Sequence, residues 1–396
     1  MNRKIIGLIS IMILLISTGC WNRRELNEIA LVVGMSIDKQ EENYLVTVQV
    51  VDPGEVASQK GGGGRTPVTT YSSTGTHIFE AIRRMTTVTP RRLYFAHLQM
   101  FIVSEAIAKE GISNVLELIY RDPEFRKDFF IVVTQDVKAK EILENLTSLD
   151  KIPAIKMHSS LEASEKSWAP TVAVQMDELI SALTSDGKNP VLTGITIIGD
   201  QEKGETKENV EKIDAYARLK YRNIAVFKKD KLVGWLNEKE SKGFNFILGN
   251  VKSTVGKIPC PEKGEVILEI VDSKVKVKGE VVNGKPKIYI NIFAETNIGE
   301  VACHLDLTKP NTITLLEEEA NKVNEDILHT VVTKAKTLNS DIFGFGEIIH
   351  RADPEAWNSL KRDWDNEFKN LDVSVHVEYK IRRTGVVNQS FLEKEE

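Results

Sequence analysis

The chain has 396 residues, of which 41% are hydrophobic and 28% are charged, and its formal net charge is -5. This balance is typical of a globular protein and excludes a wholly disordered chain. The weak acidic charge argues against a bulk basic surface for nucleic acid. At about 100–200 residues per domain, the length predicts two or three domains.

The first 19 residues have the pattern of an export signal. Arg3 and Lys4 precede an uncharged run of 12 residues at 5–16, whereas a spanning helix needs about 20 apolar residues. Small residues follow, and Cys20 comes directly after them. We therefore expect a lipoprotein signal peptide at 1–19, cleavage before Cys20, and a diacylglyceryl and acyl lipid (palmitate, for example) on the Cys20 thiol.

The alternative is a plain secretory signal with an unmodified cysteine. Lipoboxes usually carry Leu three residues before the cysteine, and this chain has Ser17 there. Lipidation is favoured because a small-residue triplet ending in Gly-Cys after an apolar run is uncommon by chance. Two acyl chains would hold the protein stably on a membrane. No later stretch approaches the length of a spanning helix.

The stretch from Glu25 to Val51 predicts a β-hairpin around the polar turn QEEN. Val46, Val48 and Val50 alternate with polar residues, so one face of the second strand is expected to be buried.

A long loop follows this hairpin and contains four consecutive glycines, Gly61, Gly62, Gly63 and Gly64. No Gly-Lys-Ser/Thr follows them, so the pattern excludes a phosphate loop. A mobile surface loop is the favoured interpretation, and a contact with a partner protein is the alternative.

Helical and strand patterns alternate between residues 77 and 136, which predicts an α/β or α+β N-terminal domain. The predicted elements are a helix at 77–87, a buried strand at 91–105, helices at 105–110 and 113–122, and a strand at 127–136.

Four arginines form a basic cluster in this region: Arg83, Arg84, Arg91 and Arg92. A solvated or internally paired face is the favoured interpretation, and a site for anionic headgroups or an acidic partner is the alternative.

The sequence divides into a domain at 20–190, a small β-rich middle domain at 191–255 and a C-terminal α+β domain at 256–396. In the first of these domains, the secondary-structure patterns are weaker towards its C-terminal end, where only two helices are predicted, at 139–146 and 173–187. The middle domain is expected to hold a strand at 190–200, a polar hairpin tip at 201–212 that packs against nothing, and a second hairpin that turns at Lys229.

The last domain begins with β-rich sequence in which Asn283-Gly284 is a strong hairpin signal. A long helix is predicted from Thr312 to Thr337, a second helix from Asp353, and a closing strand with strict alternation at 372–381. An antiparallel sheet with helices on one side is expected here. For the whole chain the expected class is multidomain α+β, with mixed and antiparallel sheets and helices packed on one side of them.

Cys260 and Cys303 both fall in this β-rich region. An exported protein can keep a disulfide, but the sequence does not give their separation, so a bond and two buried free thiols both stay open. The spacing of Cys and His predicts no metal site. No nucleophile elbow, Walker loop or dinucleotide fingerprint is present, so no catalytic site or cofactor is predicted.

Several stretches resemble the Ger(x)C family, the lipoprotein C subunits of spore germinant receptors. They are CWNRRELNEIALVVGMSID (20–38), AHLQMFIVSEAIAKEGI (96–112), YRDPEFRKD (120–128), AVFKKDKLVGWLNEKE (225–240), DIFGFGEIIHRADPEAWNSLKRDWDNEF (341–368) and IRRTG (381–385). The family often has Asp after Cys-Trp, where this chain has Asn22. The resemblance implies three α+β domains and no catalysis.

The resemblance also implies a place and partners. The chain is expected on the outer leaflet of the inner spore membrane, beside an integral membrane A subunit and a multi-span B subunit, where it helps trigger germination. Candidate contacts are the glycines 61–64 and the FGFG turn at 343–346, although a packed turn whose Phe343 and Phe345 fill a core is favoured for the latter. The rival hypotheses are a solute-binding lipoprotein that captures the germinant itself, which needs a deep pocket, and an envelope enzyme.

Overall fold

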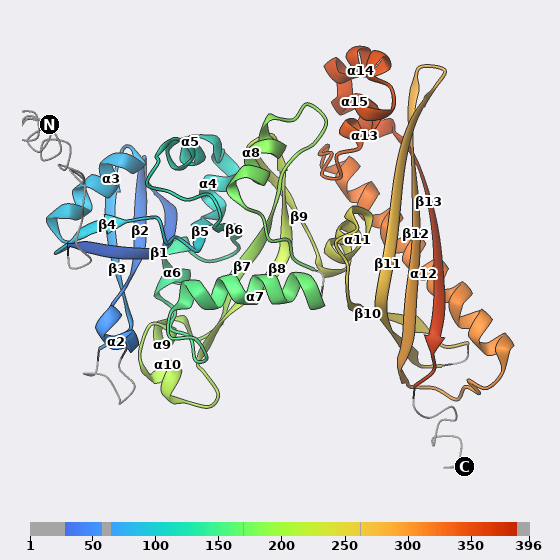
Figure 1. Ribbon diagram of the computed structural model, residues 1–396, viewed down its shortest axis with the longest axis horizontal. Helices are drawn as coiled ribbons and strands as arrows, with labels where there is room; N and C mark the ends of the chain where they lie inside the picture. Colours follow the sequence, from blue (N-terminus) through green and yellow to red (C-terminus); the bar gives the residue numbers. More distant parts are fainter. Residues whose placement is uncertain (1–27, 58–64, 169, 262, 386–396) are drawn as a thin grey trace, which may run out of the picture.

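The computed structural model describes residues 28–57, 65–168, 170–261 and 263–385, and it shows two β-sheets side by side (Figure 1). Within these residues the first sheet has nine strands in the order β3-β2-β1-β5-β6-β7-β8-β9, with β4 beside β1. Its strands are β1 (Ile29–Gln40), β2 (Asn43–Val51), β3 (Val68–Gly75), β4 (Arg92–Tyr94), β5 (Met100–Val103), β6 (Phe130–Thr134), β7 (Val191–Gly199), β8 (Ala217–Lys228) and β9 (Lys231–Leu236).

The first hairpin, β1–β2, is confirmed, with Asp38 opposite Leu45 and Gln40 opposite Asn43 across the turn. The expected buried face of β2, with Val46, Val48 and Val50, is confirmed, and its polar face is buried as well. Gln49 is fully buried, and its side chain donates to Leu143 O (2.6 Å) and accepts from Ala154 N (3.2 Å). Helices cover this face too, so a polar residue in an alternating pattern here marks a buried hydrogen bond rather than solvent.

Helices lie on both faces of the first sheet, whereas the sequence predicted helices on one side. One apolar core contains residues of α3 (Ile78–Arg84), α4 (Glu105–Glu110), α5 (Ser113–Arg121) and α8 (Met176–Thr184). A separate core contains residues of α6 (Ala139–Glu144) and α7 (Pro153–Ser167). The sequence missed α7 because few apolar residues mark its inner face, where Ala154, Met157 and Leu161 are buried.

The segment 91–105, predicted as one strand, forms β4 and β5, which both pair in parallel with β1. Smaller elements of this half are α2 (Pro53–Ala57) and the 3-10 turn η1 (Met85–Thr87).

The expected middle domain at 191–255 differs from the structure, because its strands extend the first sheet. β7 pairs with β6 in parallel and with β8 in antiparallel orientation, and β9 closes the edge. The polar segment between β7 and β8 also packs, through α9 (Gln201–Gly204) and α10 (Glu208–Glu211). Asn209 is fully buried there, and its amide donates to Leu146 O (2.8 Å) and Ala217 O (3.1 Å). The segment has no apolar stripe that would indicate packing, so the sequence predicted a free hairpin tip.

The second sheet has the order β10-β11-β12-β13 within the described chain. Its strands are β10 (Thr254–Pro259), β11 (Glu265–Val282), β12 (Lys285–Val301) and β13 (Asp372–Arg383). The predicted turn at Asn283-Gly284 is confirmed, with φ of 51° and 76° as a type I′ turn requires. The sheet is mixed rather than antiparallel, since β13 runs parallel to β12 after a long helical connection.

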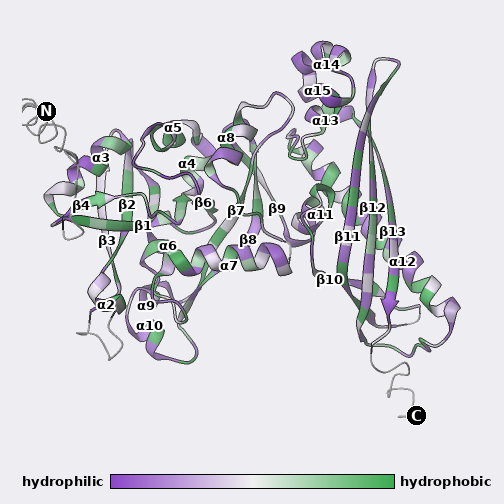
Figure 2. Cartoon of the chain, in the orientation of Figure 1, coloured by the Kyte–Doolittle hydropathy of each residue, from purple (hydrophilic) through white to green (hydrophobic). Residues whose placement is uncertain are grey.

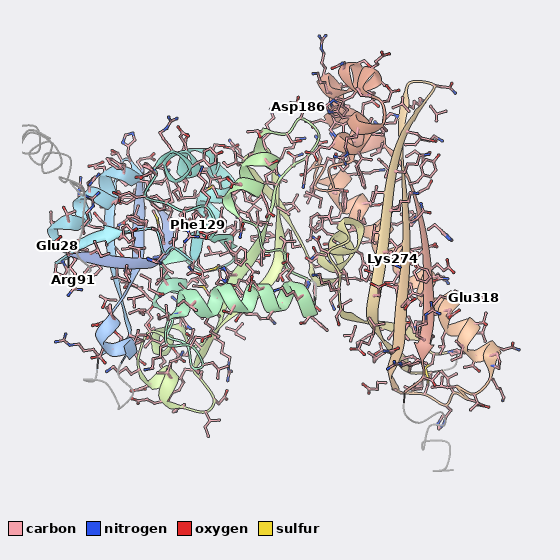
Figure 3. All side chains as sticks on the ribbon, viewed as in Figure 1. Glu28, Arg91, Phe129, Asp186, Lys274 and Glu318 are labelled. Carbon is pink, nitrogen blue, oxygen red and sulfur yellow. A yellow bond between two sulfur atoms is a disulfide. The ribbon has the colours of Figure 1, made fainter. Side chains whose placement is uncertain are left out.

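Helices cover one face of this sheet, and the other face is exposed. The covering helices are α11 (Glu238–Leu248), α12 (Pro310–Thr337) and α13 (Phe345–Ala352). Green and purple alternate along β11 in Figure 2, and Lys274, labelled in Figure 3, is one of the exposed residues of this strand.

The helix predicted from Asp353 is broken into α14 (Pro354–Leu360), the 3-10 turn η2 (Lys361–Asp363) and α15 (Trp364–Asn370). Asp353 caps α14 as expected, accepting from Ala356 N at 2.9 Å. The multidomain α+β class is confirmed.

Candidate functional site

Two of the predicted site elements, Cys20 and the glycines Gly61–Gly64, lie outside the residues that the structure describes. Their roles in anchoring and in partner contact therefore stay predictions. Across the described ranges, no helix is long and apolar enough to cross a bilayer, and no three His, Cys, Asp or Glu side chains are grouped for a metal ion.

Cys260 and Cys303 form a disulfide in the structure, with Cα atoms 6.6 Å apart and a separation of 43 positions along the chain. The bond ties the segment after β10 to the segment after β12. Next to it, Cys260 N donates to Gly264 O at 3.0 Å. The disulfide thus links two segments at one end of the second sheet, where its role is structural.

The FGFG turn lies at the junction between the two sheets, and its phenylalanines are buried, as the packed-turn interpretation predicts. The rings of Phe343 and Phe345 stack with centroids 4.9 Å apart, and Phe343 also contacts Phe244 of α11. The two rings are part of the core, so they present no aromatic surface to a partner.

Asp341 is the buried polar centre of this junction. Its carboxylate accepts from Phe345 N (3.0 Å), Gly346 N (2.8 Å) and Trp364 Nε1 (3.0 Å). Burial raises the pKa of the Asp341 carboxyl from 3.8 to about 6, and the N–H donors hold it from rising further. The sequence missed this residue because an Asp before an aromatic turn has no distinctive pattern.

The loop before β7 fits directly against this turn (Asp186 marks it in Figure 3). Asn189 N donates to Asp341 O at 2.7 Å, and Ser185 Oγ donates to Glu347 Oε1 at 2.7 Å. A Cβ at Gly187 would lie 2.7 Å from the backbone of Gly346 and Glu347. The two sheets are therefore joined by backbone packed on backbone, which leaves little space for a hinge at this point.

A cleft of about 750 Å³ opens beside the junction, between α8 and α11. Three of the carboxylates that line it serve the fold. Glu165 accepts from Ala173 N (2.9 Å), Glu178 from Gln175 N (3.2 Å), and Glu347 from Ser185. The cleft has the volume for a small solute, but most of its carboxylates are already used in local hydrogen bonds.

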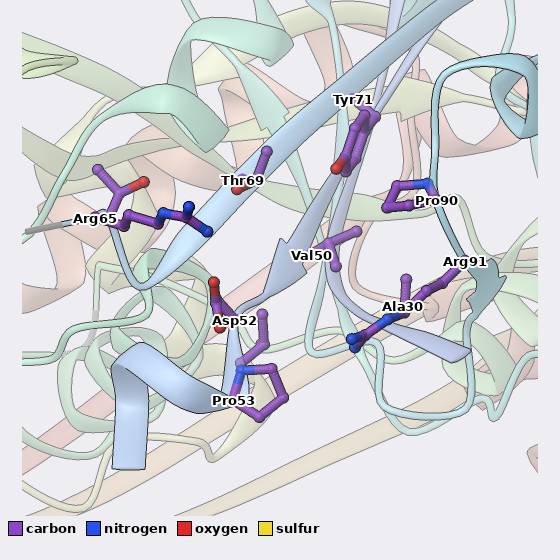
Figure 4. A pocket seen from close by; sticks show the side chains of 11 residues that line it. Ala30, Val50, Asp52, Pro53, Arg65, Thr69, Tyr71, Pro90 and Arg91 are labelled. Carbon is purple, nitrogen blue, oxygen red and sulfur yellow. The ribbon is translucent and has the colours of Figure 1, made fainter. Parts of the chain in front are cut away.

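A second cleft, of about 590 Å³, lies at the N-terminal end of the first sheet (Figure 4). Its floor is formed by Ala30 of β1 and Val50 of β2, and Tyr71 of β3 closes one end. Arg65 and Arg91 extend over it from opposite sides in Figure 4. We call it the N-terminal cleft.

The predicted arginine cluster divides in the structure. Arg84 pairs with Glu80 at 2.5 Å and Arg92 pairs with Glu124 at 2.5 Å. Arg83 lies over the ring of Phe79, with Cζ 4.8 Å from the centroid. The internally paired interpretation is confirmed for Arg84 and Arg92, and the solvated one for Arg83, which is exposed.

Arg91 is the member of the cluster that lines the N-terminal cleft. The sequence could not predict that Arg91 and Arg65 line the same cleft, because this cleft forms only when β1, β2, β3 and β4 pair.

Comparison with known proteins identifies the family. The model "Spore germination protein N-terminal domain" matches residues 22–197, and "Spore germination B3/ GerAC like, C-terminal" matches residues 222–385. The chain belongs to the Ger(x)C family of spore germination proteins.

Its relatives cover the whole length. The chain is 34% identical to spore germination protein KC of Bacillus subtilis (strain 168), with 98% of each chain covered. It is 27% identical to the putative spore germination protein YfkR of the same organism, over 95% of this chain and 96% of the relative. The crystal structure of the GerBC protein matches with a TM-score of 0.57 at 19% identity, over 88% of this chain and 96% of that one, which shows the shared fold.

Proposed function

We propose that this protein is the lipid-anchored C subunit of a spore nutrient germinant receptor. It acts without catalysis, beside an integral membrane A subunit and a multi-span B subunit, to trigger germination. The observation that carries the proposal is the end-to-end similarity to spore germination protein KC, which spans both sheets. A match over the whole chain supports a shared role better than a match of one domain would.

The anchor is the part of the proposal that rests on sequence. Cys20 follows a short apolar run and small residues, as lipidated cysteines do. β1 begins at Ile29, so only about eight residues separate the lipid from the first sheet. Fully extended, they reach about 29 Å at most. The body would therefore stay close to the outer leaflet of the inner spore membrane.

Non-catalytic action is supported by the family and by the sites. The described chain offers no nucleophile beside a base in either cleft, and the buried Asp341 carboxylate is taken up by three N–H donors. The Asp341 carboxylate therefore stabilises the junction. A catalytic carboxylate would need access to a substrate, which this buried group does not have.

The assembly is tested by affinity capture of the full, tagged chain from spore membranes, followed by mass spectrometry. We expect one A-type and one B-type membrane protein in stoichiometric amounts. We also expect a gene deletion to abolish the response to one nutrient while germination by a pressure or chelate stimulus continues. Recovery of the chain alone, together with normal nutrient germination of the deletion strain, would contradict the proposal.

A second candidate function, direct capture of the germinant, is favoured by the size of the junction cleft, about 750 Å³. Calorimetric titration of the full chain in neutral micelles with nutrient amino acids and sugars tests it. Saturable heat that is lost in Asp177→Asn or Lys188→Gln, two side chains on the lining of this cleft, would establish capture. Absence of heat for every nutrient would leave the C-subunit role without ligand binding.

A further inference from the structure

We propose that the N-terminal cleft binds the phosphate of an anionic phospholipid headgroup, and so orients the protein on its membrane. The inference rests on the proposed membrane anchoring for its biological meaning, but the cleft itself is defined by described residues. It gives the protein a second membrane contact besides the lipid on Cys20.

The first argument comes from the pairing of the cations. Neighbouring basic side chains are engaged, as shown by Arg84 with Glu80 and Arg92 with Glu124. Neither Arg65 nor Arg91 makes an ion pair within 4.0 Å of a carboxylate in the described chain. A guanidinium group without a partner offers planar N–H donors that match two oxygens of a phosphate.

The second argument is the chemistry of the lining. Hydroxyl groups of Thr69 and Tyr71 accompany the two guanidinium groups, and each can donate to a phosphate oxygen, whereas the Thr66 hydroxyl on the same lining already donates to Val68 O at 2.8 Å. Thr69 and Tyr71 are two residues apart on β3, so their side chains lie on the same face of the sheet.

Among the described residues of this lining, Asp52 is the one carboxylate, against two guanidinium groups. Its Oδ1 accepts from Gly54 N at 3.0 Å, which uses part of its capacity. The lining therefore keeps a net positive charge from these three groups. Such a site favours an anion over a neutral sugar or a zwitterion.

The position of the cleft supports a lipid source for the phosphate. Arg92 N donates to Glu28 O at 3.1 Å, so Arg91 lies next to the point where β1 begins (Figure 3). Cys20 is eight residues before Glu28, a reach of about 29 Å when extended. A free phosphate could enter from any direction, but an anchored headgroup needs a site within this reach.

A neighbouring hollow of about 380 Å³ extends the same surface, because it shares Arg65 and Thr66 with the cleft. Lys151 and Lys207 line it together with Glu55 and Glu211, so these four charges balance. The hollow thus extends the surface around Arg65 without adding net charge to it.

The test uses the full chain with Cys20→Ala, held in neutral dodecyl maltoside micelles, so that the result does not depend on lipidation. Phosphatidylglycerol and phosphatidylcholine are titrated separately, and native mass spectrometry counts the bound lipid. We expect saturable, preferential binding of phosphatidylglycerol. Arg65→Gln and Arg91→Gln should each weaken it about tenfold, as the loss of a charge-assisted contact predicts.

The matched control is Arg351→Gln, which removes the same charge from an exposed position on α13, at the other side of the molecule (Figure 1). Its affinity for phosphatidylglycerol should equal that of the parent. Equal affinity in the parent and in both cleft variants would overturn the inference. Unchanged thermal unfolding of the variants would show that lost binding reflects the cleft and not the fold.

A second arm separates the sources of phosphate. Inorganic phosphate and glycerol 3-phosphate are titrated into the same micelles by calorimetry. Weak or absent heat, with strong binding of phosphatidylglycerol, supports the lipid. Tight binding of the soluble phosphates with the same arginine dependence, and no lipid preference, would overturn the lipid assignment. Neither outcome bears on whether the protein joins a germinant receptor, which the affinity capture tests separately.

Discussion

Replacing Asp341 by alanine should loosen the junction between the two sheets. The substitution removes the acceptor of three buried donors, Phe345 N, Gly346 N and Trp364 Nε1. The carboxylate is fully buried, and water has no access to replace it. The donors would be left without partners at the N-terminal end of α13.

The size of the effect follows from the number of donors. A buried donor without an acceptor costs about 1–3 kcal/mol. Three donors, with partial relaxation around the small cavity, predict a loss of about 3–5 kcal/mol in the free energy of unfolding. This is a large part of the stability of an ordinary domain.

Urea unfolding of the full chain in neutral micelles measures this loss, followed by tryptophan fluorescence. Trp364 reports directly, because its indole N–H loses its acceptor. Asp186→Ala is the matched control, since Asp186 lies exposed in the loop at the same junction. It should change the free energy by less than about 0.5 kcal/mol. A loss below about 1 kcal/mol in Asp341→Ala would refute the reasoning.

Three further predictions concern stability. The pKa of the Asp341 carboxyl is about 6 in the folded protein against 3.8 in the unfolded chain, so the folded protein gains a proton as the pH falls through 6. Its free energy of unfolding in urea, relative to that of Asp341→Asn, should therefore rise by about 1.4 kcal/mol from pH 7.5 to pH 5. A difference that does not change with pH would contradict the raised pKa. Gly187→Ala should lower the free energy of unfolding by about 2 kcal/mol or more, because the added Cβ would lie 2.7 Å from backbone atoms. Gly256→Ala is the control and should lower it by less than about 1 kcal/mol, because no atom lies within 4 Å of the added Cβ. Equal melting temperatures for the two variants would exclude a tight junction. The double variant Cys260→Ser, Cys303→Ser opens a loop of 43 residues and should lower the free energy of unfolding by about 4 kcal/mol. The parent protein, once reduced, should unfold at the same urea concentration as the double variant. If a reductant did not change the unfolding of the parent, the disulfide would be contradicted.

Much of the local structure could be predicted from the sequence, because local rules decide it. The hairpin at Asn283-Gly284 and the cap at Asp353 depend on residues within a few positions, and both are in the structure. The long helix 312–337 follows from its apolar stripe and begins two residues earlier than expected.

The assembly of the sheets was harder to predict, because it depends on contacts between distant residues. The strand pairing β6–β7 joins Val132 to Thr193 and makes one sheet where two domains were expected. Gln49 and Asn209 are buried polar anchors, and each donates to a backbone carbonyl more than 60 residues away in the sequence, that of Leu143 and that of Leu146. A pattern of alternation cannot distinguish such residues from solvent-facing ones.

The same holds for the sites. Cys20 could be proposed from its neighbours alone, since a lipidation signal is read along the chain. The N-terminal cleft could not be found in this way. Arg65 and Arg91 are 26 positions apart in the sequence and line one cleft only in the folded sheet.

The central claim, a lipid-anchored receptor subunit, is tested most directly by Cys20→Ala in spores that carry this chain as their copy of the subunit, with Ser17→Ala as the control. Metabolic labelling with an alkyne fatty acid, membrane fractionation and nutrient-triggered germination are read in the same spores. We expect Cys20→Ala to abolish the label and to reduce nutrient germination sharply, while Ser17→Ala keeps both. Normal labelling and germination in Cys20→Ala would contradict it.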